Sequence, residues 1–371
     1  MAGLTTTILQ PASFAELADA VRAVPRVLAV GAGTKPRLSA VDTVKLSTAG
    51  LRGISEYDPS EFTFTAAAGT PVREIAAALA ERGQYLPFDP VLVEAGATLG
   101  GTVAAGLSGP GRFRFGGVRD FILGVRFVDG AGRLLRLGGK VVKNAAGFDL
   151  PKFFVGSLGR FGVLAEITFK VFPRPAATRT LRLDAATLDD AVLILTAAAL
   201  TRFEFDALDL PPGETGVLAR LAAPTAALDA LSREVLARWP GAMLSDDDAQ
   251  RTWTELREFR WCAATAPLVK VALAPAKVGP LGLAVQALAG ARMHVSAGGN
   301  VAFVALADAA QAPAFDAQLR QLALPGLTLR GTAPLWLGTH TQPAITAAVK
   351  AALDPVGRFP ELSVPSVPSV P

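Results

Sequence analysis

An α+β fold with more than one domain is predicted by three features of this sequence. The chain has 371 residues, which is more than a single hydrophobic core usually serves. Its composition is 51% hydrophobic and 18% charged, as in globular proteins and unlike disordered chains. Segments with strand periodicity and segments with helix periodicity occur on both sides of residue 175, so we expect sheets and helices in each part.

The N-terminal part alternates between helix, strand and turn patterns up to about residue 90. Ser13 and Glu16 have the spacing of a capping box before an apolar helical pattern. A strand is expected at 26–30, and the stretch FTFTAAAG predicts another. Thr70 and Pro71 then suit the cap and the first position of a helix.

The composition changes to mostly small residues at 94–117, which reads EAGATLGGTVAAGLSGPGRFRFGG. This segment is too glycine-rich for a regular core element, and we expect its backbone to lie against something flat or extended. The next stretch, LGVRFVDGAGRLLRL, predicts a hairpin that turns at Asp129 and Gly130. Residues 163–171 alternate between apolar and polar side chains, which predicts a half-buried strand.

Two prolines, Pro173 and Pro175, mark a predicted domain boundary. Beyond them, helical spacing occurs near 187–200 and 225–238, and strand-like runs occur near 268–274 and 301–306. We therefore expect a separate α+β cap domain. The stretch PAITAAVKAAL near the end resumes helical spacing, whereas SVPSVPSVP is expected to form a disordered tail.

Several classes of protein are excluded by composition. The longest apolar run, AVLILTAAAL, has half the length of a membrane span, and no signal peptide pattern is present, so we expect no transmembrane segment and a cytoplasmic protein. A single cysteine, Cys262, excludes an intrachain disulfide framework, and one Cys with two His cannot build a zinc or iron–sulfur site, so no metal is expected. The formal charge is +4, but Lys and Arg are scattered, which argues against nucleic acid as a partner.

A glycine turn in VLAVGAGTKPR poses the first functional question. Gly31 and Gly33 fit the start of a dinucleotide fingerprint, but Pro36 stands where the third glycine should be, and the Walker spacing is absent. Two interpretations stay open. The turn is either an ordinary end to a strand or a nest of backbone N–H groups for an anion, with Thr34 and Lys35 beside it.

Three glycine-rich segments stand in order along the chain: GAGTKPR, ATLGGTVAAGLSG and GSLGRFGVLAEITFKVFP. Together with NAAGFDLPKFFVGSLG and VKAALDPVGRF, they resemble the vanillyl-alcohol-oxidase superfamily of FAD-binding proteins. Over residues 11–175 the chain looks more closely like the FAD-binding subunits of bacterial glycolate oxidases, particularly across PASFAELADAVRA and FDPVLVEAGATLGG.

The resemblance implies a domain layout. Residues 1–175 would form a PCMH-type FAD-binding domain of two subdomains, and 176–335 the α+β cap. Residues 336–362 would return to the FAD-binding domain, and 363–371 would be the disordered Ser-Val-Pro tail.

The resemblance also implies FAD as the cofactor. The FAD would be held without a covalent link, because the glycine segments contain neither His nor Cys. Small side chains would leave a slot for the flat ring, and backbone groups would take the pyrophosphate and the adenine end. The residues expected to contact FAD are Gly31, Ala32, Gly33, Thr34, Lys35, Ala97, Thr98, Gly100, Gly101, Thr102, Ala105, Ser108, Gly109, Gly162 and Val163.

By the same resemblance the chain is an FAD-dependent oxidoreductase subunit of a glycolate oxidase (dehydrogenase) complex. That complex would oxidise a 2-hydroxy acid such as glycolate to the 2-oxo acid, with a larger FAD-containing subunit and an iron–sulfur subunit as partners. It would lie in the cytoplasm or, peripherally through the complex, at the inner face of the membrane.

A second interpretation is an accessory flavoprotein for electron relay or assembly, with catalysis in a paralogous subunit. It is favoured by the cap stretch MHVSAGGNVAFV, which keeps Gly-Gly-Asn but lacks the spaced histidines of related dehydrogenases. His294 and His340 are the only histidines, and neither is assigned a catalytic role. Arg112, Arg114 and Arg119 are candidate clamps for a substrate carboxylate, although a role as solvated or backbone-capping arginines is the better explanation for at least two of them.

Overall fold

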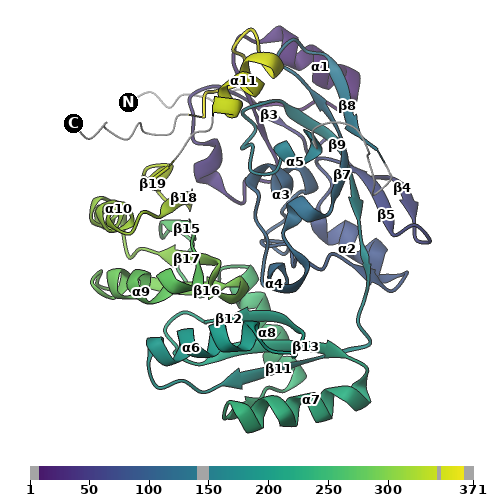
Figure 1. Ribbon diagram of the computed structural model, residues 1–371. Coiled ribbons are helices and arrows are strands. Elements are labelled where there is room, and N and C mark those ends of the chain that lie inside the picture. Colours follow the sequence, from purple (N-terminus) through teal and green to yellow (C-terminus); the bar gives the residue numbers. More distant parts are fainter. Residues whose placement is uncertain (1–7, 140–149, 341–343, 363–371) are drawn as a thin grey trace.

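The computed structural model describes residues 8–139, 150–340 and 344–362 and has an α+β architecture (Figure 1). The predicted tail at 363–371 lies outside these residues, as does much of the stretch NAAGFDLPKFF. The predicted fold class is therefore observed in the part of the chain that the structure covers.

Three sheets build the part that precedes residue 175. They are the parallel β1-β3-β2, the antiparallel β4-β5-β9-β7-β8 and the small pair β10-β6. Their strands are β1 (Ile8–Leu9), β2 (Val27–Val30), β3 (Val44–Ser47), β4 (Ile54–Asp58), β5 (Thr63–Ala67), β6 (Gln84–Tyr85), β7 (Ile122–Val128), β8 (Leu134–Gly138), β9 (Val163–Lys170) and β10 (Phe172–Pro173). The helices are α1 (Phe14–Ala23), α2 (Val72–Ala80), α3 (Leu99–Ala105), α4 (Arg112–Phe115) and α5 (Leu150–Phe153), with 3₁₀ turns η1 (Pro36–Ser39) and η2 (Val118–Asp120).

Local sequence signals explain several of these elements. Ser13 caps α1 by accepting a hydrogen bond from the Glu16 backbone at 3.2 Å, as the capping-box spacing predicts. The predicted hairpin is confirmed, because β7 and β8 pair with Val128 opposite Leu134. The alternation predicted for 163–171 is also confirmed, since Ile167 and its apolar neighbours in β9 pack into the core of this sheet.

Two sequence-based predictions were wrong. The segment 94–117 contains the regular helix α3, because Gly100 lies so close to Ala68 that an added Cβ would come within 2.8 Å of the alanine Cβ. Glycine there permits close packing of a helix rather than preventing one. Thr70 does not cap α2, because its hydroxyl accepts a hydrogen bond from the Gly53 backbone at 2.9 Å instead.

The cap contains two antiparallel sheets, β12-β13-β11-β14 and β16-β17-β15-β18-β19, which meet at an isolated bridge between Leu210 and Val295. Their strands are β11 (Ala177–Leu183), β12 (Phe205–Asp209), β13 (Val217–Ala223), β14 (Gly241–Met243), β15 (Leu268–Ala272), β16 (Arg292–Ser296), β17 (Val301–Ala305), β18 (Pro325–Arg330) and β19 (Trp336–Gly338). The helices are α6 (Leu188–Ala199), α7 (Thr225–Arg238), α8 (Asp246–Arg257), α9 (Val278–Gln286) and α10 (Ala312–Gln321), with 3₁₀ turns η3 (Pro275–Lys277), η4 (Ala297–Gly299) and η5 (Ala309–Gln311).

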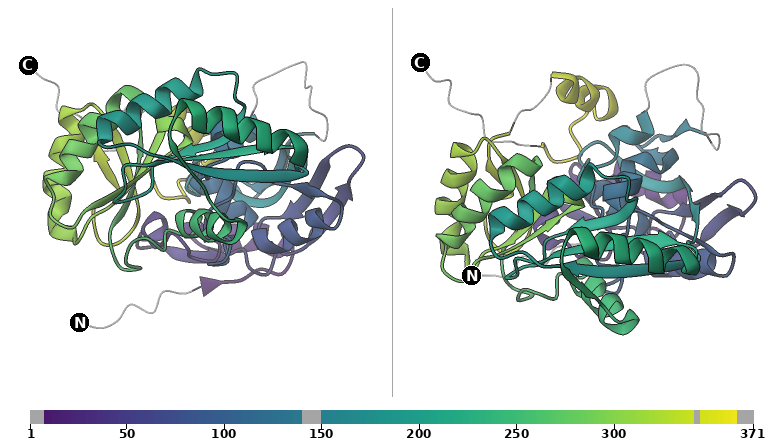
Figure 2. Two further views of the ribbon diagram at one scale, coloured as in Figure 1. Left: turned by 90° about the horizontal axis from the view of Figure 1, so that it is seen from below. Right: turned by 60° about the horizontal axis from the view of Figure 1, so that its bottom comes forward.

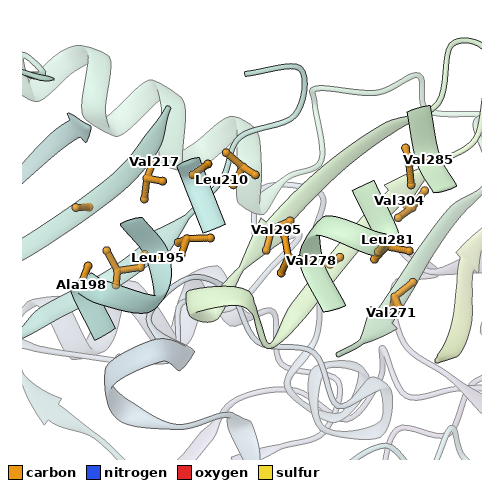
Figure 3. Close-up of a cluster of buried hydrophobic side chains, with 14 of the residues drawn as sticks. Leu195, Ala198, Leu210, Val217, Val271, Val278, Leu281, Val285, Val295 and Val304 are labelled. Atoms are coloured by element: carbon orange, nitrogen blue, oxygen red, sulfur yellow. The ribbon is translucent and has the colours of Figure 1, made fainter. Parts of the chain in front are cut away.

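Each face of these two sheets is covered differently. Helices α6, α7, α9 and α10 cover one face, where Leu195, Leu281 and Val295 belong to a shared core (Figures 2 and 3). The other face packs on the N-terminal part, where Trp253 and Phe259 of the cap meet residues such as Leu158. The cap is thereby fixed against the N-terminal part by buried apolar contacts.

The last described helix, α11 (Ala344–Leu353), lies on the N-terminal part rather than on the cap (Figure 1). Asp354 holds the end of this helix and the residues that follow it in place. Its buried carboxylate accepts hydrogen bonds from Lys350 Nζ at 2.7 Å and from the backbone of Arg358 and Phe359. We keep 1–175, 176–335 and 336–362 as proposed domain limits, although β19 at the start of the last range pairs with β18 in a cap sheet. Across 8–139, 150–340 and 344–362, no helix is both long enough and apolar enough to cross a bilayer.

We expect Asp354→Ala to lower the free energy of unfolding by about 3–5 kcal/mol, because it leaves the buried Lys350 ammonium without its carboxylate. Chemical denaturation followed by circular dichroism measures the change. The matched control is Asp19→Ala, which removes an exposed ion pair with Arg22 and should cost less than about 1 kcal/mol. Equal effects of the two substitutions would contradict the anchoring role.

Candidate functional site

A cleft in the N-terminal part has an empty volume of about 760 Å³, which includes space open to solvent. Three segments form it: the loop 31–35 after β2, the first turn of α3, and the turn 157–162 before β9. Clefts formed where several chain segments converge are typical sites for small molecules and cofactors.

The loop 31–35 offers unused backbone donors to the cleft. Gly33 has a φ of +69°, and none of the described residues accepts a hydrogen bond from the backbone N–H groups of Ala32, Gly33 or Thr34. The Lys35 Nζ donates to the Thr34 hydroxyl at 2.9 Å. Burial lowers the pKa of Lys35 to about 8, and no carboxylate offsets this effect. The loop therefore has the features of an anion-binding nest.

The absence of a side chain at Gly31 lets this loop pack against α3. A Cβ on Gly31 would lie 2.4 Å from Thr98 Oγ1, the atom that caps α3 by accepting from the Gly101 backbone at 3.2 Å. Gly101 differs from its neighbour Gly100. A Cβ on Gly101 would meet only Thr98 Oγ1, at 3.0 Å, whereas a Cβ on Gly100 would collide with Ala68. Gly101 thus presents open backbone to the cleft.

The third wall is the turn 157–162. Gly159 has a φ of +71°, which favours glycine, and a Cβ on Gly162 would come within 2.8 Å of the Phe127 ring. The Ser157 hydroxyl is buried beside the cleft and has no hydrogen-bond partner among the described residues. Buried polar groups normally have a partner, so this hydroxyl is suited to a ligand.

The structure brings together most of the residues predicted from the sequence. Those that line the cleft are Gly31, Ala32, Gly33, Thr34, Lys35, Thr98, Gly100, Gly101, Ala105 and Gly162. Five others, Ala97, Thr102, Ser108, Gly109 and Val163, are buried nearby but outside its lining. Ser108, for example, accepts a hydrogen bond from the Val118 backbone at 2.9 Å, so its hydroxyl has a structural partner.

Other lining residues were missed. They are Ala29, Val30, Leu38, Ser39, Thr48, Ala68, Ala104, Ser157, Leu158, Gly159 and Leu164. Ser157 and Gly159 stand inside the quoted motif GSLGRFG and could have been found there. Leu38 and Ala68 reach the cleft only through tertiary contacts, and the sequence carries no local signal for them.

Charged groups gather where the cap meets the end of α3. Lys270 of β15 donates from Nζ to the Gly106 carbonyl at 3.1 Å, and burial together with the neighbouring Arg112 lowers the pKa of Lys270 to about 8. A separate buried pair joins Arg220 to Asp89 at 2.6 Å. The cations Lys270 and Arg112 thus lie close together on the cap side of the N-terminal part.

The remaining candidates have partners within the protein. His294 is buried, and its Nε2 lies 2.8 Å from Asp209 Oδ2. The His340 Nε2 lies 2.6 Å from the Leu337 carbonyl, and burial lowers the pKa of His340. Arg114 donates to Glu204 at 2.8 Å, so it is less available as a carboxylate clamp than Arg112 or the exposed Arg119. Within the described ranges, no group of three or more His, Cys, Asp or Glu side chains could hold a metal.

Comparison with known sequences identifies the first part of the chain. Residues 5–138 match the family described as FAD binding domain. Over 131 residues the chain is 54% identical to glycolate oxidase subunit GlcE of Escherichia coli (strain K12). The aligned region covers 35% of this chain and 37% of that protein. It is 31% identical over 166 residues to glycolate oxidase subunit GlcD of Bacillus subtilis (strain 168), covering 43% and 35% respectively. The matched region thus spans little more than a third of each relative.

Comparison with solved structures covers nearly the whole chain. Alkyldihydroxyacetonephosphate synthase superposes with a TM-score of 0.69 over 94% of this chain and 76% of that chain, at 16% sequence identity. At this identity the likeness shows the fold alone. It confirms the predicted PCMH-type fold with its α+β cap.

The residues of the cleft fit FAD, the cofactor that the family match supports. A dinucleotide needs donors for its diphosphate, and the loop 31–35 offers free N–H groups and the Lys35 ammonium. It also needs close backbone approach, which the absence of a side chain at Gly101 allows.

We expect Gly101→Val to abolish FAD binding in a folded protein, because the added side chain would enter the cleft. Flavin absorbance relative to protein absorbance measures the loss, and circular dichroism checks the fold. Ala80→Val, at an exposed helical position, is the control and should keep its flavin. A normal flavin content in Gly101→Val would show that the first turn of α3 is only structural.

A second expectation concerns pH. An anion beside the Lys35 ammonium raises the pKa of that group, so binding takes up a proton wherever free Lys35 is neutral. The Kd for FAD should therefore rise by up to about tenfold per pH unit above pH 8, which is the approximate pKa of free Lys35, and stay flat below it. Fluorescence titration between about pH 6.5 and 9.5 measures the profile.

Two substitutions at this position complete the pH experiment. Lys35→Met should bind FAD more weakly at neutral pH and lose the rise. Lys35→Arg should bind well across the range, because its guanidinium stays charged. A profile shared by the wild type and Lys35→Met would exclude Lys35 as the titrating group.

Proposed function

We propose that this chain, whose residues 5–138 match the family described as FAD binding domain, is the FAD-binding subunit of a glycolate oxidase complex. The complex oxidises a 2-hydroxy acid such as glycolate to the 2-oxo acid. The observation that carries the proposal is the cleft, in which free backbone donors and the Lys35 ammonium meet the open backbone of Gly101. The relatives that share this part of the chain are glycolate oxidase subunits and D-lactate dehydrogenases.

Two cations where the cap meets α3 argue for a substrate that carries a carboxylate. Lys270 and Arg112 lie together at the interface between the cap and α3, and burial keeps the Lys270 Nζ out of bulk water. Two cations in such a place suit the carboxylate of a 2-hydroxy acid. Bound FAD would accept the hydride equivalent from the hydroxyl-bearing carbon.

The relatives are named as subunits, which implies a complex of several chains. We propose a larger FAD-containing subunit and an iron–sulfur subunit as the partners of this chain. We further propose a cytoplasmic location, including attachment to the inner face of the membrane through the complex.

A second function is favoured by the environment of the histidines. Both side chains are engaged within the protein, His294 by Asp209 and His340 by the Leu337 carbonyl. With neither histidine poised as a free base, an accessory flavoprotein for electron relay or assembly fits as well. In that case a paralogous subunit removes the substrate proton.

One experiment tests both functions. The purified chain should bind FAD and, alone, reduce a dye with glycolate slowly, and the rate should increase when the companion subunits are added. Turnover by the single chain as fast as by the reconstituted complex would exclude the accessory function. Loss of that turnover in a His294→Ala, His340→Ala double variant would assign the base to a histidine. A chain that binds no FAD would overturn both proposals.

The link to the cofactor is tested separately. We expect FAD to be non-covalent, because the cleft lining contains neither His nor Cys. Acid precipitation should therefore release all the yellow colour into the supernatant, and flavin retained in the pellet would contradict the expectation.

A further inference from the structure

A buried guanidinium lies directly behind the wall of the cleft. Arg160 is 1% exposed, and its Nη2 donates to the Leu38 carbonyl at 3.2 Å. Its Nε and Nη1 are also buried but have no hydrogen-bond partner in the described ranges. The backbone at this position is well held, because the Arg160 carbonyl accepts a hydrogen bond from Lys350 Nζ at 2.8 Å.

No acidic side chain compensates this charge. Burial lowers the pKa of Arg160 to about 10, without an offsetting carboxylate. The charge of Arg160 in turn helps to lower the pKa of Lys45, so a second cation lies near Arg160. An uncompensated buried charge costs several kcal/mol, so a folded chain that keeps one is suited to a ligand of opposite charge.

The surroundings of Arg160 belong to the cleft. Leu158 and Gly159 precede it along the chain and line the cleft, and so does Leu38, which accepts its hydrogen bond. The unpartnered Ser157 hydroxyl lies in the same turn. Lys35, at the end of the loop 31–35, lines the same cleft. It is the other cation whose desolvation no carboxylate offsets. The diphosphate of a dinucleotide carries two negative charges, which matches these two cations in number.

We propose that Arg160 favours binding of the FAD diphosphate by its charge, from behind the cleft wall, and that, together with Lys35, it supplies the positive charge that the cofactor neutralises. The proposal rests on the proposed function, because it takes FAD as the ligand of the cleft. It also implies that the chain without FAD is destabilised by Arg160 and that FAD relieves this cost.

The test compares Arg160→Met with the wild type in two measurements, the melting temperature of the FAD-free protein and the Kd for FAD. Without FAD, Arg160→Met should melt at least about 2 °C higher than the wild type, because an uncompensated buried charge is gone. Its Kd for FAD should increase by roughly tenfold, because a buried positive charge close to the diphosphate site is lost. Arg160→Lys keeps the charge and should recover a large part of the affinity.

Arg26→Met is the control, since Arg26 is exposed and is not one of the residues that line the cleft. It should change neither quantity. A lower melting temperature of FAD-free Arg160→Met would overturn the proposal, because Arg160 would then stabilise the fold itself. An unchanged Kd in Arg160→Met, with a wild type that binds FAD, would overturn it while leaving the proposed function intact. Failure of the wild type to bind FAD would overturn both.

Discussion

The close approach of the loop 31–35 to the start of α3 is the constraint on which the candidate site depends. Gly31 lies against the Thr98 hydroxyl, and Gly100 lies against Ala68, with no room for a Cβ in either place. Because these contacts hold α3 against the sheet, the neighbouring Gly101 faces the cleft with open backbone. A side chain at Gly31 or Gly100 would separate the two walls even though neither residue carries chemistry.

The cleft and the interface with the cap differ in how their buried charges are compensated. Two cations lie at the cleft, the half-buried Lys35 and the buried Arg160 behind its wall, and no carboxylate offsets the desolvation of either one. At the interface with the cap, by comparison, Arg220 has a protein counter-charge in Asp89 at 2.6 Å. A site that keeps positive charge without protein counter-charges favours an anionic ligand, whereas the paired groups fix the position of the cap.

The sequence predicts most of this arrangement wherever a local pattern carries it. Alternation identified β9, and the ordered glycine segments placed Gly31, Thr98 and Gly162 around one cleft. The helix α3 was missed because its glycines serve packing against Ala68, which local propensity does not report. Leu38 and Arg160 were missed because their roles arise from contacts between segments far apart in the chain.

We infer that FAD is bound jointly by the loop 31–35, the first turn of α3 and the turn 157–162. Hydrogen–deuterium exchange of the purified chain, with and without FAD, tests it most directly. We expect slower exchange in all three segments on addition of FAD, with the free N–H groups of Ala32 and Gly33 among the most protected. Protection confined to the cap, with unchanged exchange at residues 31–35 and 157–162, would contradict it.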